Sequence, residues 1–483
     1  MSDQSPSSVP ESLPGDAFAG TPAPTAQAPG ESEQAEGVLQ SVAGEQAIAP
    51  QIPPTTSQMA APMPRMLQAL RNRDFRLFWI GNFLSNVGTW MQNVAQGWLV
   101  LDLAGPLAPH QVLGRFQTNG AFWLGVVGFA ASAPMLVFAL IGGVIADRVN
   151  RRNLMLCTQT AMMICAFIMA ILAYASPTHA RMIKIPEIIW LAFANGLASS
   201  LNAPSQQALV PRLVPKEDLA NAIALNSAQF NLSRLIGPAI GGLIMAWLSV
   251  SANFLLNGIS FLALIFVLSK IHYPDQRTGP SGASLWQNLA EGFRYVFQSP
   301  QMSSLLMLVA LASIFVIPFI TFIPLFARDI LHAGQRGFGF LMASAGIGAF
   351  LGSITIAWLG RKYLRGSFVV RSATLLCVAV IGFTFSRKSF LSGALLMLAG
   401  YAMILMVATV NTLLQHLSSE AMRGRVMSFY ATAFLGFAPV GSLIAGSLAG
   451  AITAPYAIAG MSSLALVAAW ALYAMSPELR KLS

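Results

Sequence analysis

The chain has 483 residues, of which 55% are hydrophobic and only 10% are charged, and its formal net charge is +10. Soluble domains carry about 25% charged residues, so the composition excludes a soluble protein and indicates a polytopic protein of the lipid bilayer. The length allows about twelve helices of roughly 20 residues with short loops. Basic loops that orient such helices explain the positive charge, and we expect no nucleic-acid partner.

Residues 1–64 differ in composition from the rest of the chain. They hold seven acidic residues and no Lys or Arg, and they are rich in Pro, Ser, Ala, Gly and Gln without hydrophobic periodicity. This predicts a disordered cytoplasmic tail, for which a passive role is favoured and a regulatory role stays open. Arg65, Arg71, Arg73 and Arg76 follow directly, and they hold this terminus in the cytoplasm.

Twelve apolar runs follow in two groups of six. The runs lie at about 77–101, 119–146, 153–175, 186–208, 222–248 and 252–270, and then at about 302–327, 337–359, 367–386, 390–415, 424–449 and 452–475. We therefore expect an N-terminal six-helix half at 65–270, a connector at 271–301, a C-terminal half at 302–476 and a short cytoplasmic C-terminus at 477–483. Apolar residues at helical spacing in the connector predict an amphipathic helix on the membrane surface.

The distribution of Lys and Arg supports this topology. Cytoplasmic segments would hold 20 of these residues and outer loops seven, while Arg234 lies within a span. Twelve spans with both termini in the cytoplasm fit this bias, and they predict a multi-pass protein of the inner (plasma) membrane. Asp102 ends the first span and Asp329 ends the seventh, which suggests that the two halves are repeats.

The first span carries a polar stripe. At 100° per residue its polar residues fall within an arc of about 120°; they are Asn82, Ser85, Asn86, Thr89, Gln92, Asn93 and Gln96. Because an amide exposed to lipid costs several kcal/mol, the stripe faces protein or a water-filled cavity. We interpret it as part of a substrate path, which Asn253 and Asn257 of the sixth span would extend. Hydrogen bonding between helices is the alternative.

The fifth span combines Asn231, a buried charge and a glycine-proline motif. Arg234 is the only charged residue deep in a predicted span, which makes it a functional candidate. It either binds an anionic group of a substrate or donates to helix carbonyls, and both interpretations stay open. Gly237, Pro238, Gly241 and Gly242 predict close helix approach and a bend that helps to seal one side, with simple close packing as the alternative.

A short basic loop between the second and third spans carries a family resemblance. Its residues Gly143, Asp147, Arg148, Arg151 and Arg152 resemble the loop 2–3 signature of the major facilitator superfamily. Asn150 stands where that family usually has glycine, and asparagine suits a left-handed turn. Segments 70–79, 88–95 and 207–227 look like the branch that contains enterobactin exporters and macrolide efflux proteins, and the resemblance covers about 65–475.

The resemblance implies an all-α membrane fold of twelve transmembrane helices in two pseudo-symmetric six-helix halves. It also implies an antiporter-like exporter of siderophore-like or drug-like small molecules that works by alternating access and uses the proton gradient. By the same analogy, the loop residues Gly143, Asp147, Arg148, Arg151 and Arg152 form a conformational latch between the halves on the cytoplasmic side.

The coupling of protons rests on the resemblance alone. No Asp or Glu lies deep in a predicted span, which leaves Asp102 and Asp329 as candidate proton sites. A path of amides, aromatic rings and one Arg favours neutral or anionic cargo over a cationic drug. An importer or facilitator on the same fold, or a non-transporting scaffold or sensor, are the alternatives.

Enzymatic chemistry has no signature in this chain. No nucleophile–base set, metal-ligand spacing or nucleotide loop appears, so we expect no enzyme activity, no cofactor and no metal. The three cysteines, Cys157, Cys165 and Cys377, lie in apolar runs and are interpreted as packing residues. We expect the protein to work as a monomer.

Overall fold

The computed structural model describes residues 65–105, 120–148, 150–174, 182–271, 285–359 and 365–481. Within these ranges, side chains are described except at 65–66, 136–148, 204, 208, 285–289, 421 and 481. The predicted tail at 1–64 therefore lies outside the described residues. Every long element in the described ranges is a helix.

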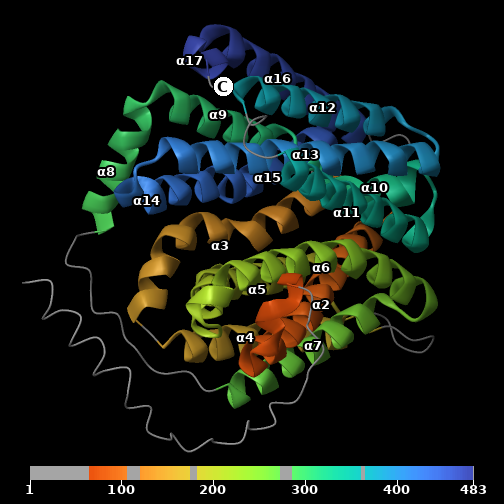
Figure 1. Cartoon of the computed structure of the whole chain (residues 1–483). Coiled ribbons are helices and arrows are strands. Elements are labelled where there is room, and N and C mark those ends of the chain that lie inside the picture. The colour runs from red at the N-terminus through yellow and green to blue at the C-terminus, as the bar shows by residue number, and fades with distance from the viewer. Residues whose placement is uncertain are drawn as a thin grey trace, which may run out of the picture. The chain divides into compact units, whose positions relative to one another are not determined.

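The first six long helices follow a short helix η1 (Arg65–Arg71) and match the six predicted runs to within a few residues. They are α2 (Arg73–Ala104), α3 (Gly120–Arg148), α4 (Arg151–Leu172), α5 (Ile185–Leu209), α6 (Leu219–Trp247) and α7 (Val250–Lys270). Two short 3-10 turns, η3 (Val210–Arg212) and η4 (Lys216–Asp218), join α5 to α6. Figure 1 labels these helices.

The second group begins after the connector helix α8 (Leu285–Gln298). Four of its members are continuous: α11 (Gly334–Leu359), α12 (Gly366–Phe385), α13 (Ser389–Leu417) and α16 (Ala454–Met475), followed by the short α17 (Pro477–Lys481). Two are interrupted. One consists of α9 (Pro300–Phe315), α10 (Phe319–Leu325) and η5 (Phe326–Ile330), and the other of α14 (Glu420–Ala431), η7 (Thr432–Gly436) and α15 (Ala438–Ile452).

The two interruptions differ from the continuous spans that the apolar runs predicted. In the first, a turn at residues 316–318 precedes α10, and η5 is a π-helix. Pro318 and Pro324 lie in this segment and cannot donate a backbone hydrogen bond, which explains why the helix breaks there. In the second, the π-helix η7 ends just before Pro439, the second residue of α15.

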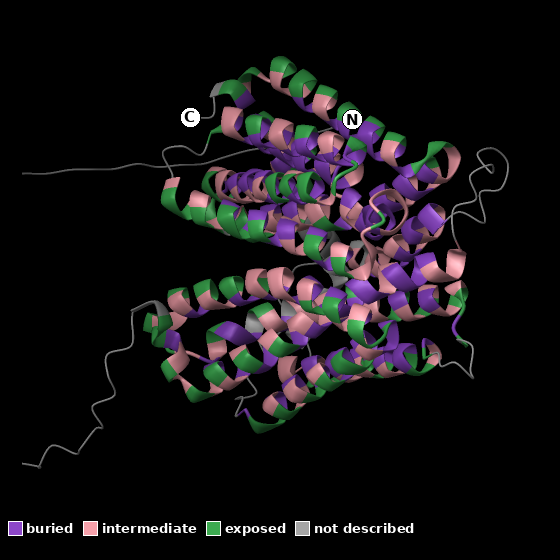
Figure 2. Ribbon diagram, turned by 90° about the vertical axis from the view of Figure 1, so that its right-hand side faces the viewer, coloured by how far each residue is buried: buried purple, intermediate pink, exposed green. Residues whose placement is uncertain are grey.

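The described ranges contain twelve long helical segments, which fit a membrane protein. Eight are long and apolar enough to cross a bilayer, including the interrupted segments as Pro300–Ile330 and Met422–Ile452, and α2, α3, α5 and α6 complete the twelve. Exposed residues recur along the helices (Figure 2). Many are large and apolar, such as Trp190, Trp358 and Phe390 at 72%, 86% and 83% exposure. Such side chains suit contact with lipid, and the predicted all-α membrane fold is confirmed.

The two helix groups meet through small residues near one end of the helices, which we name the Asp102 end. There α2 and α6 finish, and α3 and α11 begin. Helix α6 lies on α11, and α3 lies on α15 (Figure 1). A Cβ atom added to Gly242 would stand 2.7 Å from the Gly339 Cα, and one added to Gly125 would stand 2.8 Å from the Gly446 Cα. Only residues without a side chain allow helix backbones to approach so closely.

The connector helix α8 packs against the start of α14. Gly292 lies under the Phe429 ring, and Glu291 forms an ion pair with Arg425. The Ser419 N–H donates to the Tyr295 hydroxyl at 3.2 Å. These contacts tie α8 to the second helix group.

Asn150 does not form the left-handed turn that we expected from its place in the loop. Its φ is −58°, and its side chain caps α4 by accepting hydrogen bonds from the Arg152 and Asn153 N–H groups at 3.1 and 3.3 Å. The prediction was wrong because asparagine is also among the best N-cap residues, and α4 begins one residue later.

Candidate functional site

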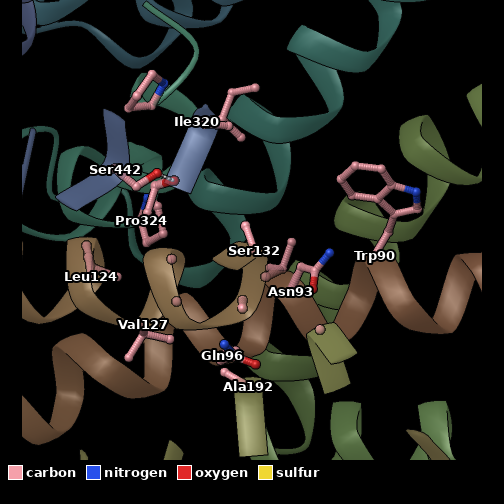
Figure 3. Close-up of a pocket in the computed structure, with 18 of the residues that line it drawn as sticks. Trp90, Asn93, Gln96, Leu124, Val127, Ser132, Ala192, Ile320, Pro324 and Ser442 are labelled. Carbon is pink, nitrogen blue, oxygen red and sulfur yellow. Dashed lines mark hydrogen bonds between the residues drawn. The ribbon is translucent and has the colours of Figure 1, made fainter. Parts of the chain in front are cut away.

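A cavity of about 460 Å³ lies between the two helix groups. Helices α2, α3 and α5 wall it from one side, and the interrupted segments together with α11 wall it from the other (Figure 3). Its polar lining is Thr89, Asn93, Gln96, Ser132, Asn195, Ser199, Thr321 and Ser442. The described lining contains no charged side chain, so it offers hydrogen bonds to a ligand without a fixed charge.

Helix α2 contributes the predicted stripe residues Thr89, Asn93 and Gln96 to this lining. They follow one another at helical spacing, so they share one face of α2. Figure 3 shows the Asn93 and Gln96 side chains on the same helix as Trp90, which marks one edge of the cavity. These residues stand where a ligand would meet them, and their part in a substrate path stays a prediction.

The interrupted segments form the facing wall. Thr321 and Pro324 come from α10, Leu435 from η7 and Ser442 from α15. The Thr321 and Ser442 hydroxyl oxygens lie 3.4 Å apart, and therefore join the two segments. Irregular backbone at membrane depth is tolerated where it is buried in protein or lines a cavity, and here it lines one.

Four other predicted path residues lie between helices instead of on the cavity wall. Gln92 is 2% exposed and accepts a 2.7 Å hydrogen bond from the Asn257 side chain. Asn253 donates to the Gly241 carbonyl at 3.2 Å, and Ser85 is also buried. Gln92, Asn253 and Asn257 make the hydrogen bonds between α2, α6 and α7 that we considered as the alternative, because a buried amide needs a partner.

Asn86 and Asn231 are also absent from the described lining. The Asn86 side-chain nitrogen is buried and has no hydrogen-bond acceptor among the described residues, although Asn86 shares a helix face with Thr89 and Asn93, which line the cavity. Asn231 donates to the Ser227 carbonyl of its own helix at 2.9 Å.

Arg234 lies beside the cavity, against a residue that lines it. Its guanidinium carbon is 5.8 Å from the centroid of the Trp90 ring, and the Phe230 ring meets Trp90 edge-on with centroids 6.2 Å apart. Within the described residues Arg234 forms no hydrogen bond or ion pair, so the donation to helix carbonyls that we considered is not seen there.

The glycine-proline motif of α6 lies in helix contacts. A Cβ atom added to Gly237 would stand 2.5 Å from the Trp90 Cβ, and one added to Gly241 would stand 3.1 Å from the Met91 Cα. Gly242 contacts α11, and Pro238 is buried within α6. The structure therefore shows close packing at this motif, while the bend and the seal stay predictions.

The predicted latch is only partly described. The side chains of Gly143, Asp147 and Arg148 lie outside the described residues, although the backbone of α3 continues to Arg148. Arg152 donates to the carbonyls of Leu268 and Ser269 at 2.6 and 2.7 Å. It therefore caps α7 in its own half and not the other half, because the last carbonyls of a helix have no partners in the helix and attract a cation. Arg151 begins α4.

The structure brings Asp102 and Asp329 together around Arg328, which the sequence interpretation missed. Arg328 donates to both Asp329 carboxylate oxygens at 2.7 and 3.2 Å and to the Gly105 carbonyl at 3.1 Å. One guanidinium nitrogen is 4.0 Å from an Asp102 oxygen. The cluster joins α2 of the first half to η5 of the second, and the adjacency of Arg328 to Asp329 was its only signal in the sequence.

Comparisons with known proteins agree with this architecture. Residues 65–482 match a family described as transmembrane secretion effectors. The staphyloferrin A transporter of Staphylococcus aureus is 23% identical over 399 residues, which cover 81% of this chain and 94% of that protein. The enterobactin exporter EntS of Escherichia coli O1:K1 is 26% identical over 397 residues, with coverage of 81% and 89%.

A solved structure shows the same fold. The crystal structure of the nucleoside transporter NupG matches with a TM-score of 0.65 at 14% identity, covering 83% of this chain and 99% of that one. The twelve helices in two groups and the family match over residues 65–482 lead to one conclusion. The chain belongs to the transmembrane secretion effector family of the major facilitator superfamily, and it is a multi-pass membrane transporter.

Proposed function

We propose that this transporter exports a small molecule across the inner membrane by alternating access and that the proton gradient drives it. The observation that carries the proposal is the cavity of about 460 Å³ with walls from both halves, which touch at the Asp102 end. In transporters built from repeats, substrate sites lie at the interface of the repeats, and rocking of the halves exposes the site to either side.

The direction and the cargo are supported by relatives and by the chemistry of the lining. Relatives at 23% and 26% identity are a staphyloferrin A transporter and an enterobactin exporter. Neutral hydroxyl and amide groups beside Trp90 and Phe338 suit a siderophore-like or drug-like molecule with aromatic and polar parts.

The topology follows from the bias of Lys and Arg. With both termini in the cytoplasm, the Asp102 end is the outer end, and the halves are in contact there. An exporter loads its cargo from the cytoplasm in this arrangement. Asp147 and its neighbouring arginines would then hold the cytoplasmic end closed in the opposite arrangement.

The Arg328 cluster is where we propose that protons act. Arg328 lies between Asp329 of its own half and Asp102 of the other. Protonation of either carboxylate removes the negative charge that holds the guanidinium, so a proton that arrives from outside weakens the contact between the halves. The outer end then opens, and the cargo leaves as the proton enters.

Transport into everted membrane vesicles tests the function. A catecholate siderophore, a macrolide and a lipophilic cation are supplied with and without a proton ionophore. We expect accumulation of at least one neutral or anionic cargo that collapses with the ionophore, and loss of this ionophore-sensitive accumulation in Asp329→Asn. Accumulation that is unchanged by the ionophore would contradict proton coupling. Uptake only into vesicles of the native orientation would favour an importer.

A further inference from the structure

We infer that Arg234, Trp90 and Phe230 form a subsite for a planar aromatic anion, a ring that bears a carboxylate or phenolate oxygen. The inference rests on the proposed function, because it specifies a class of cargo for the same cavity. It concerns binding, which is measured without transport.

The charge of Arg234 requires a partner. A guanidinium at membrane depth is costly, and such residues normally pair with an acid or with backbone carbonyls. Arg234 has neither partner in the part of the chain that the structure describes, and the described cavity lining holds no carboxylate. The side chain is partly buried, and it lies against Trp90, which lines the cavity. A ligand that carries a negative charge supplies the missing partner.

The second step is the orientation of the guanidinium. Trp90 holds it face-on at 5.8 Å, which is within the range of a cation–π contact. The Trp90 ring can lie along α6 because Gly237 leaves room for the Trp90 Cβ. A guanidinium group is planar, and its N–H groups match the two oxygens of a carboxylate.

The third step is the apolar and polar surroundings of this charge. Trp90 and Phe230 meet edge-on and offer aromatic surface beside the guanidinium, where the ring of a ligand can pack. Thr89 and Asn93 flank Trp90 on α2 and line the cavity with neutral hydrogen-bonding groups. An aromatic anion with hydroxyl groups can pack its ring on Trp90 and Phe230, pair its charge with Arg234 and form hydrogen bonds with the polar lining. A cation would be repelled by the positive charge of Arg234.

A structural role for Arg234 makes a different prediction. If Arg234 only joins α6 to α2 through Trp90, its removal destabilises the protein and weakens all ligands alike. A subsite instead predicts that removal weakens anions selectively.

Equilibrium binding to the purified protein in lipid nanodiscs separates the two roles. The probes are salicylate, its neutral counterpart salicylamide and the cation benzyltrimethylammonium. The wild type is expected to bind salicylate about tenfold more tightly than salicylamide, since a charge-assisted hydrogen bond contributes at least about 1.4 kcal/mol, a tenfold change. Arg234→Gln should bind the two equally, and Arg234→Lys should keep part of the preference.

A second arginine serves as the control for Arg234. Arg336→Gln, an exposed arginine on α11, should leave the preference unchanged. The melting temperature of each variant reports folding, and Arg234→Lys keeps the test valid if Arg234→Gln unfolds. The inference is overturned if the wild type shows no preference for salicylate, if neither probe binds at millimolar concentration, or if Arg234→Gln keeps the preference.

The transport assay distinguishes this failure from a failure of the proposed function. Export of any cargo without a preference for anions would support the proposed export function and contradict the subsite. Salicylate binding that depends on Arg234, without export of any cargo, would support the subsite and contradict the proposed export function.

Discussion

Arg328 joins the two halves through its side chain. It binds Asp329 with two hydrogen bonds and reaches the Gly105 carbonyl and Asp102 across the interface. The cluster is partly buried, with side-chain exposures of 17% for Arg328 and 16% for Asp329. A charged group in such a place loses part of its hydration, so its partners matter for the stability of the contact.

Arg328→Gln should favour opening of the outer end. Loss of charge-assisted hydrogen bonds of about 1.5–3 kcal/mol is expected to raise the population of the open arrangement by roughly tenfold or more. A cysteine at Asn93 in the cavity should then react faster with an impermeant thiol reagent added from outside, in a chain whose native cysteines are replaced. Arg336→Gln is the matched control, and equal labelling rates in both variants would contradict a latch at Arg328.

At the scale of elements, the connector helix α8 shows two unlike sides. The Phe293 and Phe297 rings contact each other at an angle of 34°, with centroids 4.3 Å apart, and the two residues are 54% and 56% exposed. Glu291, Arg294 and Gln298 follow one another on a different side of the helix. An exposed aromatic pair beside charged residues is typical of a helix that lies in the membrane interface.

Spin labels at α8 test this placement. A label on a cysteine at Phe297 is expected to be accessible to oxygen, which concentrates in the bilayer, and poorly accessible to a nickel chelate in water. A label at Gln298 should show the reverse, because it lies about 100° away around the helix. Power-saturation EPR in proteoliposomes measures both. Equal accessibility at the two positions would place α8 in water and exclude an interfacial helix.

For the molecule as a whole, alternating access requires the two halves to separate at the outer end. Gly128 of α3 and Ser442 of α15 belong to different halves and both line the cavity. A Cβ atom added to Gly128 would stand 3.4 Å from the Ser442 Cβ, close to the separation of about 3.8 Å that disulfides have.

A disulfide between these positions should arrest transport. In Gly128→Cys/Ser442→Cys, again without the native cysteines, oxidation is expected to form the bond and to reduce transport to background. Reduction should restore it. Mass spectrometry detects the bond, and the two single variants under oxidant are the controls. Full transport by the cross-linked protein would mean that the halves do not separate at this place.

The polar stripe of α2 shows which features of the site could be predicted from the sequence and which could not. Helical periodicity correctly collected its seven residues on one face, and the cost of an amide in lipid required partners for them. Periodicity could not tell Thr89, which lines the cavity, from Gln92, which bonds to Asn257. That choice depends on which neighbouring helix stands opposite each turn. In the same way, the sequence identified Arg234 as a charged residue deep in a span. Its contact with Trp90 could not be predicted, because that contact depends on how α6 packs against α2.

The helices, their number, their two groups and their place in a membrane could be predicted from the sequence, because they follow from local hydrophobicity, length and charge. What lies between the two groups became visible only in the folded chain: the cavity, the contact of Gly242 with Gly339, and the contact of Arg328 with Asp102. It also revealed that the spans with Pro318, Pro324 and Pro439 break where they form the cavity wall. Gly242 and Gly339 are 97 positions apart in the sequence, and Arg328 and Asp102 are 226 apart. Such pairings arise only from the packing of one helix on another.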